Sequence, residues 1–171
     1  MPKVNKEKKH THVSDQICLR AAVAVLVAYG REDLASVISA TNPQPADVPT
    51  IEISSQTLNY NPEFIRSIGF TELVKVLAHE ALHVTRDHTS RFYVCIDGFK
   101  EMFQRAADLE INTYLESTNI GAPQGIIPGK GEYASFPKHL TAEDYLPVLI
   151  KKDAAALEDN RIKPVPNGEQ G

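Results

Sequence analysis

One stretch of the sequence decides the fold prediction for this chain: Leu77-Ala78-His79-Glu80-Ala81-Leu82-His83-Val84. It places two imidazoles and one carboxylate in an otherwise apolar run. Residues four apart on an α-helix differ by only about 40° in direction, since each residue turns the helix by about 100°. If the stretch is helical, His79 and His83 therefore share a face, and both rings can bind one metal ion.

Glu80 follows the first histidine and can reach a water molecule activated by that metal. This is the His-Glu-x-x-His pattern of zinc peptidases, in which the histidines bind zinc and the glutamate is the general base. The alternative is that His79 and His83 are core residues satisfied by backbone carbonyls, with Glu80 a solvated helix residue. Two core histidines at the one spacing that allows chelation would be a costly coincidence, because each buried polar group needs a partner. The metal site is therefore favoured.

The residues before the motif favour a helix. Residues 70–78 contain no Gly or Pro and are apolar at helical spacing. We expect Thr71 to cap this helix, with Glu72 in its first turn. His88 comes five residues after His83, so on a continuous helix it would point about 140° away from it. We expect His88 to pack or hydrogen-bond nearby instead of binding the metal.

The next predicted helix, residues 97–115, carries Ala106-Ala107-Asp108-Leu109-Glu110-Ile111-Asn112. A carboxylate among such apolar neighbours is drawn inward, where it must find a metal ion or an arginine. Asp108 and Asn112 share a face, so one can bind the metal while the other supports a ligand. Glu110 points about 200° from Asp108, so both cannot face one site. The alternative for Asp108 is a salt bridge to Arg86, Arg91 or Arg105.

Length and composition bound the remaining choices. The 171 residues, 42% of them apolar, can form one domain with a substantial core. A net charge of −4 gives no reason to invoke nucleic acid as the main partner. Cys18 and Cys95 form no Cys-x-x-Cys pair, so we expect neither a zinc knuckle nor a disulfide framework. A reducing compartment, the cytoplasm, fits best.

The N-terminus shares two features with a signal peptide, because four lysines precede an apolar stretch at residues 21–29. Three polar residues interrupt the approach, however, no small-x-small cleavage site is present, and the stretch is too short to span a bilayer. We expect instead a disordered basic arm at residues 1–13, one domain at residues 14–156 and a flexible tail at residues 157–171.

Around the metal-binding helix we expect further helices and a small β-sheet or hairpin, which makes the fold class α+β. Ser14 or Asp15 can cap a first helix that ends at Gly30. A second short helix is expected at residues 33–39. Thr141 can cap the start of a last helix.

Between the second helix and the metal-binding helix the sequence indicates β-structure. Clustered Pro, Asn and Asp predict a loop at residues 41–49. Residues 50–60 are β-rich and predict one strand, or two strands with a bend at Ser54-Ser55. A strand directly before a metal-binding helix can hold a peptide at a sheet edge, although an ordinary strand covering the core fits equally well.

The segment at residues 117–138 is rich in glycine and proline, and we expect a long irregular loop. Loops of this length in a compact domain are usually functional or mobile. Tyr133 and His139 could bring a polar hydrogen to a reacting carbonyl. Beyond the loop, Pro147 should kink or break the last helix.

The motifs stand in a characteristic order: residues 60–64, 76–83, 106–112 and 140–145, with His88 and Arg91 between the second and the third. In this order they resemble the metallopeptidase domain that is often joined to a von Willebrand factor A-like domain. The resemblance covers about residues 15–150. Two features depart from the pattern. Ser54-Ser55-Gln56 stands where Thr-Asp-Gly is expected, and we expect no room for a von Willebrand factor A-like domain.

The resemblance implies a zincin-like α+β fold in which His79, His83 and Asp108 bind one zinc ion. It also implies Glu80 as the general base, and Asn112 lies where related zincins place a group that orients a ligand. A free-standing member is expected to have its own partner or substrate.

Three functions are compatible with these features. The leading one is a cytoplasmic zinc-dependent metalloendopeptidase that acts on a protein or peptide, with no nucleic-acid or membrane partner. The second is a metal-stabilised binding protein without turnover, part of a larger protein assembly, with the strand and the long loop as its contact surface. The third is a non-peptide amidohydrolase, which a narrow closed pocket instead of an open groove would favour.

Overall fold

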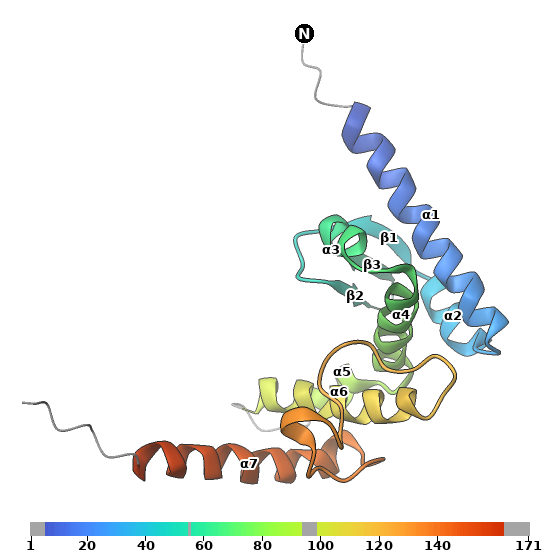
Figure 1. Cartoon of the computed structure of the whole chain (residues 1–171). Coiled ribbons are helices and arrows are strands. Elements are labelled where there is room, and N and C mark those ends of the chain that lie inside the picture. The colour runs from blue at the N-terminus through green and yellow to red at the C-terminus, as the bar shows by residue number, and fades with distance from the viewer. Residues whose placement is uncertain (1–5, 55, 94–98, 163–171) are drawn as a thin grey trace, which may run out of the picture.

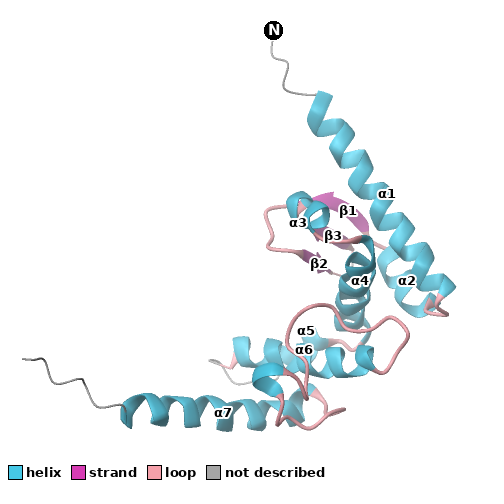
Figure 2. Cartoon of the chain, in the orientation of Figure 1, coloured by secondary structure: helices cyan, strands magenta, loops and turns pink. Residues whose placement is uncertain are grey.

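The computed structural model in Figure 1 describes residues 6–54, 56–93 and 99–162. Its helices are α1 (Lys6–Ala28), α2 (Glu32–Ser39), α3 (Pro62–Ser67), α4 (Phe70–Thr85), α5 (His88–Tyr93), α6 (Lys100–Glu116) and α7 (Ala142–Ile162), with a short 3-10 helix at Gly131–Tyr133. Its strands are β1 (Asn42–Pro45), β2 (Ile51–Ile53) and β3 (Thr57–Tyr60). Helices dominate, and the strands form one small sheet (Figure 2). The α+β prediction is confirmed at this level.

The sheet has the order β1-β3-β2, with β1 parallel and β2 antiparallel to β3. The prediction of two strands within residues 50–60 is confirmed, although residue 55 of the expected bend lies outside the described residues. The prediction of a loop at residues 41–49 is wrong for residues 42–45, which form β1, and holds for residues 46–49. Asn42 donates its N–H to the carbonyl of Gln56, just before β3, and Ala46 donates its N–H to the carbonyl of Tyr60 in β3. Residues 43 and 45, both prolines, therefore face the open edge, where a strand needs no donor.

The His-Glu-x-x-His motif lies on α4, which runs from the sheet towards α6 (Figure 1). This helix packs against α1, α2, β2 and α6. Its buried apolar side chains belong to one core with residues of α1, α2 and the sheet, including Leu26, Leu34, Leu58, Leu73 and Leu77. The apolar stripe of the motif helix thus faces the core, as its spacing indicates.

A second apolar cluster joins α6 to α7 and the long loop. It contains Phe103, Leu109, Tyr133, Tyr145 and Leu149. The last turns of α6 belong to the first core instead, through Ile111 and Leu115. Because α6 is packed on both sides, it is held firmly across the end of α4.

The observed N-termini of two helices differ from the predicted ones. The first helix begins at Lys6, so neither Ser14 nor Asp15 caps it. Asp15 is buried and pairs with Arg66 at 3.1 Å instead. For α4 the N-cap is Gly69, without a side-chain hydrogen bond, and Thr71 lies inside the helix. The division into arm, domain and tail remains a prediction.

The last helix starts as predicted, because the amide of Asp144 donates to the hydroxyl of Thr141 at 3.3 Å. The expectation that Pro147 breaks it is wrong, since α7 continues past this residue to Ile162. A proline in a helix removes one hydrogen bond. Here Tyr145 and Leu149, both fully buried against α6, anchor the helix on either side.

The predicted start of the preceding helix, Asp97-Gly98, lies outside the described residues. Within the described part of the chain, no helix combines the length and apolar character needed to cross a membrane.

Candidate metal centre

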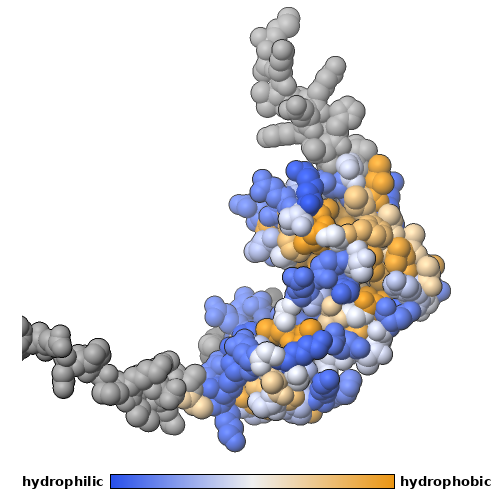
Figure 3. Space-filling view, viewed as in Figure 1, coloured by the Kyte–Doolittle hydropathy of each residue, from blue (hydrophilic) through white to orange (hydrophobic). Residues whose placement is uncertain are grey.

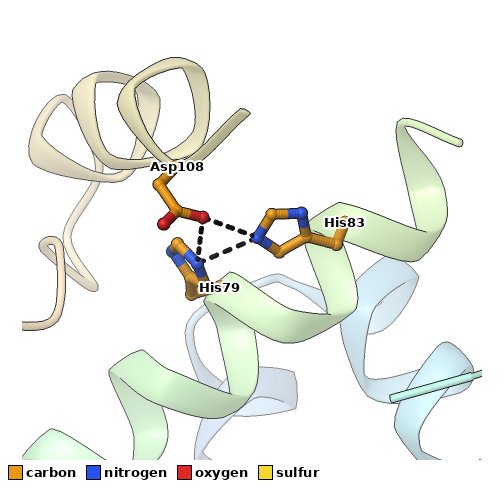
Figure 4. Close-up of side chains that lie close together, drawn as sticks. All are labelled: His79, His83 and Asp108. Atoms are coloured by element: carbon orange, nitrogen blue, oxygen red, sulfur yellow. Dashed lines mark hydrogen bonds and ion pairs between the residues drawn. The ribbon is translucent and has the colours of Figure 1, made fainter. Parts of the chain in front are cut away.

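The structure brings together the three residues expected to bind metal (Figure 4). Nε2 of His79 and Nε2 of His83 are 3.0 Å apart. Oδ1 of Asp108, from α6, lies 3.4 Å from the first of these atoms and 3.2 Å from the second. The three side chains therefore present their ligand atoms to a common point.

The spacing of these atoms fits a zinc ion. Zinc binds histidine nitrogen and carboxylate oxygen at about 2.0–2.2 Å in tetrahedral geometry, so neighbouring ligand atoms lie about 3.3 Å apart. The three observed distances, 3.0, 3.2 and 3.4 Å, lie close to that value. If these three groups held a zinc ion, its fourth position would be open, which is typical of catalytic zinc sites.

Asn112 fixes the orientation of the first histidine. Its Oδ1 lies 2.8 Å from Nδ1 of His79, and its Nδ2 donates to the carbonyl of Ile126 at 2.8 Å. Because the amide N–H₂ is used by that carbonyl, the amide oxygen accepts from Nδ1 of His79. Nε2 of His79 is then the nitrogen that faces the metal position. Asn112 thus has the place that the resemblance implies.

His88 lies behind the second histidine. The motif helix ends at Thr85, and Asp87 has a positive φ of 51°, so the chain turns before α5 begins at His88. Nδ1 of His88 is 3.0 Å from Nδ1 of His83, on the side of the ring away from the metal position. The expectation that His88 hydrogen-bonds nearby is confirmed.

The charges of the site are strongly coupled. Burial alone would raise the pKa of Asp108, but hydrogen bonds from His79 and His83 outweigh it and lower the pKa to about 2. Burial lowers the pKa of His83. For His79 the lowering by burial is outweighed by the carboxylates of Asp108 and Glu80, so its pKa is raised. Without metal, His79 is therefore the more basic of the two histidines.

Glu80 is buried beside this group. Burial raises its pKa to about 7; the charges of Asp108 and Glu52 act in the same direction, and His79 opposes them. A carboxyl group with a pKa near neutrality can both accept and release a proton at the pH of the cell.

Two cavities meet at the site and share Thr50, Glu80 and Asp108 in their walls. The first has a volume of about 420 Å³, and its apolar walls come from Phe64, Ile68, Val76, Pro123 and Ile126. The second has a volume of about 760 Å³ and is more polar, with walls that include Glu52, Ile53, Thr89, Lys100 and Gln104. In Figure 3 the surface is hollowed between the part that carries the sheet and the part that carries α6. Together they form a cleft with the candidate metal centre at its middle.

Comparison with known proteins agrees with this geometry. A family model described as "putative metallopeptidase domain" matches residues 17–163. The chain belongs to this metallopeptidase-domain family. No curated protein and no solved structure matches it. The resemblance read from the motifs is thereby confirmed.

Two residues expected near the reacting carbonyl of this metallopeptidase domain lie elsewhere. The hydroxyl of Tyr133 accepts from Arg105 at 3.3 Å, and its ring is buried in the second cluster. His139 is exposed, and neither residue lines the two cavities. The long loop contributes instead through residues 123–126, which form one wall of the first cavity.

The salt-bridge alternative for Asp108 does not hold. Arg86 and Arg91 pair with Glu110, and Arg105 pairs with Asp153 at 2.9 Å. Glu110 is the residue of this metallopeptidase domain that sequence reasoning placed away from the site without giving it a role. An acidic residue between Leu109 and Ile111 was the available signal that it is buried.

Proposed function

We propose that this chain is a zinc-dependent peptidase in which His79, His83 and Asp108 hold the metal and Glu80 is the general base. The observation that carries the proposal is the three-ligand group at tetrahedral spacing, with the buried Glu80 beside it in the cleft. When bound, zinc would supply Lewis-acid activation of a water molecule and of the substrate carbonyl.

Glu80 carries the proton in this mechanism. It accepts a proton from the attacking water, whose oxygen forms a bond to the carbonyl carbon of the peptide. As the C–N bond breaks, Glu80 passes the same proton to the leaving nitrogen. Its pKa of about 7 suits both steps, because neither protonation state is strongly favoured at neutral pH.

The edge of the sheet supports a peptide as the substrate. In the antiparallel pairing, Glu52 stands opposite Asn59, and the amide of Asn61 donates to the carbonyl of Thr50. The main-chain groups of Ile51 and Ile53 therefore point away from β3, towards the free edge of β2. Thr50, Glu52 and Ile53 also line the cleft, so an extended peptide could pair with this edge.

The cleft favours an endopeptidase over the other two functions. A non-peptide amidohydrolase would suit a narrow closed pocket, whereas cavities on both sides of the metal centre leave room for a chain that continues in both directions. The apolar walls of the first cavity suit a large apolar side chain next to the cleaved bond. The zincin-like fold and the cytoplasmic location remain parts of this proposal.

The substitution Glu80→Gln tests the mechanism. We expect the variant to bind zinc like the wild type, because Glu80 is not a ligand, and to lose about 10²- to 10⁴-fold in peptide hydrolysis. A library of unstructured peptides, read by mass spectrometry, would supply the substrate. Turnover retained in Glu80→Gln would overturn the mechanism. Zinc binding without cleavage of any peptide by the wild type would favour the metal-stabilised binding protein.

A further inference from the structure

Glu110 is the centre of a hydrogen-bond cluster behind the metal centre. Its Oε1 accepts from Arg86 at 2.6 Å, and its Oε2 accepts from Arg91 at 3.0 Å and from the amide of Ala142 at 2.7 Å. Nε2 of His88 lies 3.4 Å from the same Oε2. The side chain of Glu110 is only 9% exposed, so these hydrogen bonds take the place of hydrogen bonds to water.

The cluster is connected to the metal position through two imidazole rings. Nε2 of His83 faces the metal position, and Nδ1 of His83 lies 3.0 Å from Nδ1 of His88. The other nitrogen of His88, Nε2, is the one that faces Glu110. A continuous path of hydrogen bonds therefore runs from Glu110 through His88 to His83.

Only one arrangement of hydrogens satisfies this path when both rings are neutral. An ionised carboxylate only accepts, so Nε2 of His88 must carry a hydrogen and donate it to Glu110. A neutral imidazole has one N–H, so Nδ1 of His88 is an acceptor. His83 must then donate from Nδ1, which leaves a lone pair on Nε2, the atom that a metal needs.

We propose that Glu110 and His88 are positioning residues that fix His83 in the tautomer able to bind metal. The inference rests on the metal site of the proposed function. In the opposite tautomer of His88, a nitrogen lone pair would face the carboxylate, and a charge-assisted hydrogen bond would be lost. Arg86 and Arg91 hold that carboxylate in place from the end of α4 and from α5.

The helix α6 thereby controls all three ligands. It supplies Asp108 directly, Asn112 as the partner of His79, and Glu110 as the partner of His83 through His88. Each histidine is fixed on the nitrogen that the metal does not use, one by an amide and the other by a second imidazole. The hydrogen bond to His79 and the hydrogen bond to His83 come from different residues, so each can be tested separately.

The first test reads the tautomer in the metal-free, full-length Asp108→Ala variant, because in the wild type the carboxylate of Asp108, 3.2 Å from Nε2 of His83, can also accept a hydrogen from that nitrogen. Histidine labelled with ¹⁵N, observed by ¹H–¹⁵N correlation NMR, distinguishes Nδ1–H from Nε2–H in each ring. We expect His83 to carry its hydrogen on Nδ1 and His88 on Nε2. Nε2–H as the main form of His83 would overturn the inference. The tautomer can be measured without catalysis. The test therefore separates failure of the hydrogen-bond path from Glu110 through His88 to His83 from failure of the proposed function.

The second test compares two substitutions of His88 by zinc affinity, measured by competition with a chelator. His88→Asn can place an amide oxygen where Nδ1 was, so it should accept from His83 and stay close to the wild-type affinity. His88→Phe keeps the ring but removes the acceptor, and we expect a loss of about 10- to 100-fold. Equal affinity in both variants would overturn the inference.

A matched control distinguishes an effect of the hydrogen-bond path from Glu110 to His83 from an effect of losing any charge near Glu110. Glu143 is 53% exposed and pairs with Arg91, outside the path from Glu110 to His83. Glu143→Gln should leave both the zinc affinity and the tautomer of His83 unchanged. If the tautomer of His83 changed as much in Glu143→Gln as in His88→Phe, the charges around Glu110 would act together. That result would contradict a specific path through His88.

Discussion

The amide oxygen of Asn112 lies 2.8 Å from Nδ1 of His79, on the opposite side of the ring from Asp108. The amide and the carboxylate stand four residues apart on α6 and hold one imidazole between them. His79 is therefore oriented before any metal binds.

Loss of this amide should weaken the metal site without removing a ligand. For Asn112→Ala we expect zinc affinity to fall by about 10- to 100-fold, because the ring of His79 loses the partner that sets its tautomer. Chelator competition would measure the change. Glu101→Gln, at an exposed position of the same helix, should bind zinc like the wild type. An unchanged affinity in Asn112→Ala would contradict the assigned role.

Glu110 should make the fold sensitive to acid. Burial would raise its pKa, but hydrogen bonds from His88, Arg91, Ala142 and Arg86 outweigh burial and lower it. A carboxyl group whose pKa is lower in the folded state stabilises the fold above its unfolded value of about 4.3, and this contribution is lost as the pH falls towards the folded pKa.

Urea denaturation at a series of pH values from neutral to below about 4 would measure this contribution of Glu110 to stability. Glu110→Gln should be less stable than the wild type at neutral pH, and the difference should shrink as the pH falls below about 4. The exposed Glu101→Gln has the same change of chemistry and should show no such trend. A constant difference between Glu110→Gln and the wild type at all pH values would contradict the assignment.

Zinc binding should release a proton. The raised pKa of His79 favours a proton where the metal must bind, so zinc affinity should fall as the pH decreases. Calorimetry in buffers of different ionisation enthalpy should show proton release on zinc binding that grows as the pH decreases. Binding that is independent of pH and buffer would show that the histidines are already neutral.

The apolar cavity should set substrate preference. Ile68→Phe reduces the space in this cavity, so kcat/KM for peptides with a large apolar residue beside the cleaved bond should fall by about tenfold or more, whereas peptides with a small residue should be affected less. Ile53→Phe makes the same change in the second cavity and should leave this preference intact. The opposite pattern would assign the apolar residue to the other side of the cleft.

Local spacing was sufficient to predict which residues the structure brings together as a candidate metal group. The four-residue interval of His79 and His83 and the shared face of Asp108 and Asn112 depend only on helix geometry. The same geometry correctly placed Glu110 on the other side of its helix. What it could not supply was the partner of Glu110, because Arg86 and Arg91 reach it only after the chain turns at Asp87.

The parts of the fold that the sequence did not predict depend on distant contacts. The strand β1 contains two prolines, and its pairing with β3 decides its structure against its composition. In the same way, contacts of α7 with α6 keep the helix continuous through Pro147. The intrinsic propensity of the residues predicts secondary structure poorly where contacts with distant parts of the chain decide the structure.

The most direct test of the account is zinc content by elemental analysis of protein purified without chelator or histidine tag. Wild type should hold about one zinc per chain, and His83→Ala and Asp108→Ala should each lose it, whereas Glu80→Gln should keep it. Wild-type protein without zinc, or full zinc content in Asp108→Ala, would contradict the proposed metal centre.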